Sequence, residues 1–67
     1  MEIIDSRKLK KAIIEKKLNI SEVARLTGLQ YKIILKFING DHKARLSTIG
    51  KFAAALSIPV DFIIKNN

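Results

Sequence analysis

The sequence predicts an all-α fold, a compact bundle of five helices that forms one domain over residues 1–67. Three observations support this prediction. Apolar residues recur at intervals of three and four in several short blocks, which is the periodicity of helices with one buried face. Residues typical of helix starts and ends separate these blocks. The chain has 67 residues and contains no linker, repeat or low-complexity tract, so it has the length of one small domain.

The first helix is expected at about residues 7–17, where apolar residues share one face. Asp5 or Ser6 comes directly before it, and either side chain can accept hydrogen bonds from its first amides. Residues 1–4 are interpreted as a short apolar lead-in.

The next two helices are expected at about residues 20–26 and 30–38. Asn19 can cap the first of them, and Glu22 three residues later completes a capping box. Gly28 then permits the left-handed backbone of a tight turn. A short helix, a glycine turn and a second helix are typical of the helix-turn-helix of DNA-binding proteins.

Residues 41–46 are expected to form a polar loop after this motif. The loop holds the only histidine, His42, which we interpret as a surface residue because no cysteine or second histidine accompanies it. The sequence therefore predicts no metal site.

The last two helices are expected at about residues 48–56 and 59–65. Ser47 or Thr48 can cap the former, and Pro59 suits the first position of the latter. The last helix is too apolar for a fully solvated element, so some of its side chains must pack inward.

The charge balance favours a polyanionic partner. The chain carries 13 Lys and Arg against 6 Asp and Glu, a net charge of +7 on a very small domain. It has no cysteine, which excludes disulfides and fits a cytoplasmic protein. No apolar run approaches the ~20 residues of a membrane span, and the first residues lack a signal-peptide pattern.

The sequence does not favour an enzyme. Its six acidic residues are scattered, and no nucleophile–base pair or phosphate-binding loop is evident. A chain of this length also makes a poor substrate cavity. We therefore expect neither catalysis nor a cofactor.

The segment Asn19–Gly40 resembles the motif of the phage-repressor-like, Cro/CI-type helix-turn-helix family. Gly28 falls where the family has its turn glycine, and Asn39-Gly40 is similar to the family's helix ending. The blocks FAAALSI and VDFII further on are similar to the family's fourth and fifth helices. The resemblance implies a small sequence-specific transcriptional regulator of phage or bacterial origin that binds double-stranded DNA.

The resemblance also implies which residues contact DNA. The outward positions of the second motif helix, expected to read bases, are Gln30, Tyr31, Lys32, Leu35 and Lys36. Those expected to contact phosphates are Asn19, Ser21, Asn39, Lys43 and Arg45. The family often dimerises through its C-terminal helix, so the apolar residues of 59–65 either form a homodimer contact or only cover the core.

Three departures from the family pattern raise an alternative. Ile20 stands where many members have a phosphate-binding glutamine, and Ile33 and Leu35 are apolar where polar residues are usual. If exposed, these three residues would form a partner-binding patch. The alternative function is an antirepressor-like protein that binds another repressor through this patch. The other interpretation is that Ile33 simply packs on the core.

The third departure concerns a buried arginine–glutamate pair that the family often has between its first and third helices. Both positions are aliphatic here, Ile13 and Ile38. Replacing both members of a buried ion pair by packed apolar residues can be neutral or stabilising. The sequence therefore predicts that Ile13 and Ile38 touch.

Overall fold

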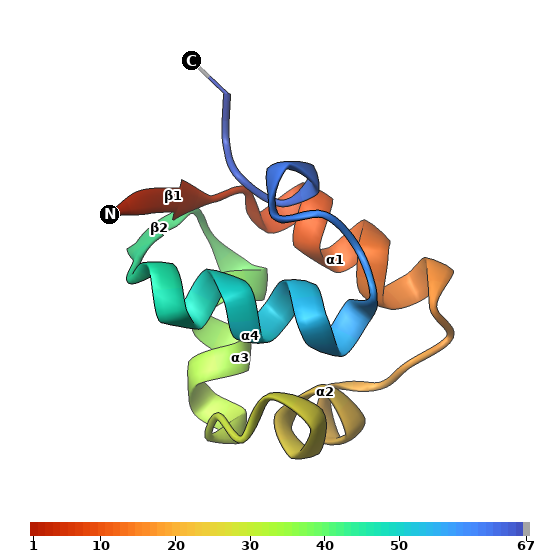
Figure 1. The fold of residues 1–67 in the computed structure, drawn as a ribbon. Coiled ribbons are helices and arrows are strands. Elements are labelled where there is room, and N and C mark those ends of the chain that lie inside the picture. Colours follow the sequence, from red (N-terminus) through yellow and green to blue (C-terminus); the bar gives the residue numbers. More distant parts are fainter. Residues whose placement is uncertain (67) are drawn as a thin grey trace.

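The computed structural model describes residues 1–66 as a helical domain with a small sheet at one end. The four α-helices are α1 (Ser6–Glu15), α2 (Ile20–Thr27), α3 (Tyr31–Asn39) and α4 (Leu46–Leu56). Two strands, β1 (Glu2–Ile4) and β2 (His42–Ala44), and a single 3-10 turn, η1 (Val60–Phe62), complete the order. Figure 1 shows α2 and α3 in the lower half, α4 across the middle, and the strands and C-terminal segment above.

The helix ends follow the short-range signals of the sequence. Asp5 caps α1, and its side chain accepts hydrogen bonds from the amides of Arg7 and Lys8. The capping box of α2 is present in full: Asn19 Oδ1 accepts from Glu22 N at 2.8 Å, and Glu22 Oε1 accepts from Asn19 N at 2.9 Å. Gly28 ends α2 with φ 74°, the left-handed conformation that favours glycine.

The interpretation of residues 1–4 as a lead-in and of 41–46 as a loop is wrong. These segments contain β1 and β2, which pair antiparallel with Glu2 opposite Ala44 and Ile4 opposite His42. Ile4 and Ala44 are buried, so the pairing brings two core side chains inward while satisfying the backbone. Strands of three residues are too short to show an alternating pattern.

The expected fifth helix is also wrong, and the five-helix count with it. Between Pro59 and Asn66 only η1 forms, and the chain then extends along β1. Ile64 makes an antiparallel bridge with Ile4, and Lys65 N donates to Ile3 O at 2.8 Å. Ile63 is fully buried, and this extended path places it in the core while pairing the backbone of its neighbours with β1.

The helix expected at 48–56 begins two residues earlier. Arg45 is its N-cap residue, with an extended backbone and no side-chain capping bond. Ser47 and Thr48, the expected caps, instead lie inside its first turn.

The core joins all of these elements. The largest fully buried side chains are Phe52, Ile4, Leu9, Ile34, Ile49, Leu56, Ile63 and Val23. Phe37 of α3 meets Phe52 of α4 edge-to-face, with ring centroids 5.7 Å apart. Because α1 and α2 both pack on α3, the inner face of α3 is fixed from several sides.

Ile13 and Ile38, at the positions of the family's ion pair, belong to this one core. They are 5% and 9% exposed, and their helices α1 and α3 pack together. Their shared burial fits the expected aliphatic replacement, and their direct contact remains a prediction.

Within residues 1–66, no helix has both the length and the apolar character needed to cross a membrane.

Candidate nucleic-acid interface

The burial pattern of α3 divides the helix into an inner and an outer face. Ile34, Phe37 and Ile38 are buried, and their spacing places them on one side of a 3.6-residue helix. Lys32, Lys36 and Asn39 are exposed on the opposite side, and Gln30 and Tyr31 are exposed at the start of the helix. We call these five residues, together with the half-buried Leu35, the outer face of α3.

The composition of the outer face suits a polyanion. It combines two amides, a phenol, two ammonium groups and one leucine, and α3 contains no acidic residue. Tyr31 is 50% exposed, so both its ring and its hydroxyl are accessible. The face offers hydrogen-bond donors and positive charge, which are what base edges and phosphates accept.

Gln30 stands at the start of α3 with its side chain uncommitted. It is the N-cap residue, yet its amide side chain makes no capping hydrogen bond. The backbone carbonyl of Gln30 instead accepts from Ile33 N and Ile34 N. Its side chain is therefore free to contact a ligand at the end of the helix.

Lys43 and Arg45 extend the basic surface beyond α3. Both are exposed, whereas Ala44 between them is buried. This alternation is that of a strand with one face toward the core. Pairing of β2 with β1 thus presents Lys43 outward, directly after the end of α3.

The predicted capping box at the N-terminus of α2 limits what this end of the helix can offer to a phosphate. The Oδ1 atom of Asn19 is already bonded to the amide of Glu22, and the Glu22 carboxylate occupies the same turn. A carboxylate there repels a phosphate and takes one of the donors that would bind it. Ser21 is exposed, so its hydroxyl and the side-chain Nδ2 group of Asn19 are side-chain donors for a phosphate.

The expected apolar patch is largely absent. Ile20 and Ile33 are only partly exposed because both pack against the hydrophobic core, and Leu35 is half-buried as well. Of the two interpretations of Ile33, the one in which it packs on the core agrees with this burial. The apolar residues replace polar ones at the margin of the core and enlarge it.

Aromatic contacts hold the residues around the end of α3. Lys36 Nζ lies 5.6 Å from the centroid of the Phe37 ring, and the His42 ring meets the same ring edge-on at 6.2 Å. His42 is an exposed residue with a packing contact, as expected for a lone histidine. In the part of the chain that is described, no three His, Cys, Asp or Glu residues are grouped to hold a metal ion.

The sequence did not predict the polar cluster formed by Asp41, Ser6 and Lys65. Asp41 follows α3, and its carboxylate contacts both the start of α1 and Lys65. These contacts span 35 and 24 residues of sequence, so no local pattern marks them.

A short capped helix, a left-handed glycine and a second helix with a basic outer face define a helix-turn-helix DNA-binding domain. Comparison with known proteins agrees with this class. The family model described as Cro/C1-type HTH DNA-binding domain matches residues 8–65, and the chain belongs to this family. The family resemblance drawn from Asn19–Gly40 is thereby confirmed.

A solved structure supports the same assignment. The chain is similar to the crystal structure of a restriction-modification controller protein from Aeromonas hydrophila, with 26% sequence identity and a TM-score of 0.79. The match covers 85% of this chain and 86% of that protein. Among curated proteins, none matches the sequence. The family and the structure together identify a DNA-binding regulator of transcription.

Proposed function

We propose that the protein is a small sequence-specific regulator of transcription that inserts α3 into the major groove of double-stranded DNA. The observation that carries this proposal is the outer face of α3, which is polar, basic and without acidic residues while the opposite face is buried. A major groove admits one helix with its side chains directed at base edges. Such a function on phage or bacterial DNA places the protein in the cytoplasm.

The outer face of α3 supplies the base contacts. Gln30 is free to pair with adenine, and Lys32 or Lys36 can donate to guanine. Tyr31 donates through its hydroxyl, and Leu35 contacts a thymine methyl group. These roles follow from chemistry and from position on the outer face.

Phosphate contacts come from both sides of α3. Lys43 and Arg45 are exposed on and after β2, and Asn39 is exposed at the end of α3. The Ser21 hydroxyl and the side-chain Nδ2 group of Asn19 donate to phosphate at the start of α2, where the capping box already uses two backbone amides. Contacts of this kind orient a protein on the duplex without reading sequence.

We also propose that two copies bind together as a homodimer on paired half-sites, which is how helix-turn-helix proteins commonly meet operators. Val60 and Phe62 of η1 are 43% and 40% exposed, so an apolar surface is available there. A Phe62→Glu variant is then expected to sediment as a monomer at concentrations where the parent protein is a dimer. A parent protein that stays monomeric on operator DNA would exclude this mode.

The repressor-binding alternative is not carried further. It needs an exposed apolar patch on the motif, and Ile20 and Ile33 pack against the core instead.

The experiment that tests the proposal is selection of bound fragments from genomic DNA at moderate salt, followed by titration of the enriched sequence. Lys43→Ala and Arg45→Ala are each expected to weaken binding to all sequences and to lower the salt slope by about one unit. Lys51 of α4 is exposed and lies outside the two motif helices in the chain, so Lys51→Ala is the matched control. Unchanged slopes in both variants would remove β2 from the interface.

Gln30→Ala tests the base-reading role separately. It is expected to relax preference at one base pair at a cost of about 1–3 kcal/mol while binding to random DNA stays the same. Equal losses on the selected sequence and on random DNA would exclude Gln30 from base reading.

A further inference from the structure

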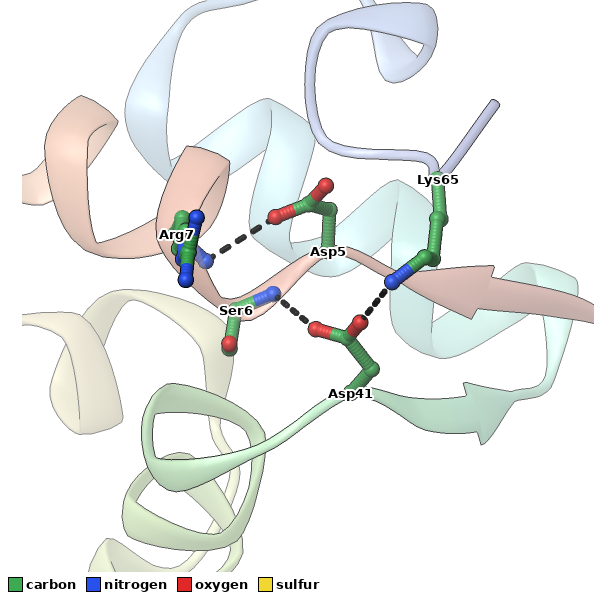
Figure 2. A pocket seen from close by; sticks show the side chains of 5 residues that line it. All are labelled: Asp5, Ser6, Arg7, Asp41 and Lys65. Carbon is green, nitrogen blue, oxygen red and sulfur yellow. Dashed lines mark hydrogen bonds and ion pairs between the residues drawn. The ribbon is translucent and has the colours of Figure 1, made fainter. Parts of the chain in front are cut away.

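Asp41 lies at the point where the chain leaves α3 and turns into β2, and its carboxylate bonds in two directions. Oδ1 accepts a hydrogen bond from Ser6 N, the first residue of α1, at 2.9 Å. Oδ2 forms an ion pair with Lys65 Nζ of the C-terminal segment. Figure 2 shows the carboxylate between these two partners, beside Asp5 and Arg7. One side chain thus joins three segments that are distant in sequence.

This cluster is not a site for an external anion. The first four amides of an α-helix lack partners within the helix. At the start of α1 all four are satisfied: Asp5 N donates to Ile63 O, Ser6 N donates to Asp41, and Arg7 N and Lys8 N donate to Asp5 Oδ1. Two carboxylates already occupy the end of the helix, so no free amide remains there for an external anion.

Backbone pairing reinforces the same junction. Asp5 N donates to Ile63 O at 2.8 Å, and Lys65 N donates to Ile3 O at 2.8 Å. β1 therefore pairs with β2 on one side and with the C-terminal segment on the other. Asp41 and Lys65 approach each other beside β1, so their ion pair fixes the start of β2 to the far edge of this small sheet.

The two partners of the Asp41 carboxylate favour its ionised form. The hydrogen bond from Lys65, and after it the one from the Ser6 amide, lowers the pKa of Asp41 to about 2. The same pair raises the pKa of Lys65. An ionised carboxylate therefore lies in the sequence between α3 and the proposed phosphate contacts Lys43 and Arg45.

We propose that Asp41 is a positioning residue for DNA binding, which holds the segment after α3 so that Lys43 and Arg45 face the phosphates. This inference depends on the proposed function. It can be tested because charge alone and positioning predict opposite changes in DNA affinity when Asp41 is removed. A carboxylate beside a basic surface weakens attraction to DNA by its charge alone, so its removal would tighten binding if it had no other role. Positioning predicts the opposite result.

The test compares two substitutions that add the same charge to the protein. Asp41→Asn keeps the shape of the side chain but removes the ion pair with Lys65. Glu2→Gln is the matched control, because Glu2 is an exposed acid of β1. Dissociation constants for the selected DNA sequence are measured at several salt concentrations, at a temperature where circular dichroism shows each variant folded.

Asp41→Asn is expected to weaken binding by about two- to fivefold, the range of an exposed ion pair, and to lower the salt slope. Glu2→Gln is expected to bind equally or more tightly. A role in stability alone would leave the slope of the folded variant unchanged. Binding by Asp41→Asn that equals or exceeds that of the parent protein would overturn the inference, as would an equal loss in both variants.

Lys65→Gln tests the pair from its other side and leaves the Ser6 contact intact. It is expected to weaken binding, and the double variant is expected to match Asp41→Asn alone, since one interaction is lost in both. Additive losses would refute the pairing. A parent protein without DNA affinity would refute the proposed function as well, whereas a parent that binds with an unaffected Asp41→Asn variant refutes this inference only.

Discussion

Gly28 and Gly50 show how one residue type serves two different purposes. Gly28 ends α2 with φ 74°, and a Cβ atom there would meet nothing within 4 Å. The cost of a side chain at this position is therefore one of backbone conformation and not of space. Gly50 lies inside α4, also with nothing within 4 Å of a built Cβ, and its backbone is helical. Only the first glycine is required by the fold.

We expect Gly28→Ala to destabilise the domain by about 1–2 kcal/mol, because alanine resists the left-handed conformation. Gly50→Ala is expected to stabilise it by about 0.5–1 kcal/mol, because alanine loses less backbone entropy in a helix. Urea titration of both variants checks the pair. Two shifts of the same sign would mean that local packing, and not backbone conformation, decides the outcome at one of these sites.

At the scale of elements, the prediction succeeded where signals are local. The start and end of α2 were predicted from Asn19, Glu22 and Gly28, and the buried face of α3 from apolar spacing, because these features depend on residues within one or two turns. Gln30 and Lys32, which the family resemblance places on the outer face, are exposed, and their role in base reading stays a prediction.

The errors concern elements fixed by distant partners. β1 meets β2 about forty residues later, and the C-terminal segment leaves the helical path to pair with β1. A helix at 59–65 satisfied every local rule, yet burial of Ile63 and backbone pairing with β1 prevailed. For the same reason, the sequence left open whether Ile20 and Ile33 are exposed, because their burial depends on packing against a core built from distant segments.

The packing of α1 on α3 gives a test at this scale. If Ile13 and Ile38 touch, Ile13→Val and Ile38→Val should each cost about 0.5–1.5 kcal/mol. The double variant should then cost measurably less or more than the sum, with an interaction energy of about 0.5 kcal/mol or greater. The cycle is measured by urea titration. Ile49→Val on α4 is the control partner for Ile13→Val, and strict additivity of Ile13 with Ile38 would place the two side chains out of contact.

In the whole molecule, the small sheet and the contacts of Asp41 with Ser6 and Lys65 connect both ends of the described chain to the segment that follows α3. β1 and the C-terminal segment enclose the start of α1, and Asp41 ties both to the end of α3. The helices supply most of the core, and these extended segments hold the chain where it leaves α3 and enters β2. The long-range contacts that sequence reasoning missed are therefore the ones that set the geometry of the basic surface.

The ion pair between Asp41 and Lys65 makes the stability of the molecule depend on pH in a defined window. The pKa of Asp41 is 3.8 when unperturbed and about 2 in the fold, so the unfolded chain binds its proton first as pH falls. The contribution of the ion pair is complete above about pH 4 and is lost as pH falls toward 2. We expect Asp41→Asn to unfold at lower urea concentration at pH 6 and to converge on the parent protein near pH 2. Glu2→Gln, which leaves the pair intact, should follow the parent curve through this window. A constant difference between Asp41→Asn and the parent at every pH would mean that the pair contributes through shape and not through charge.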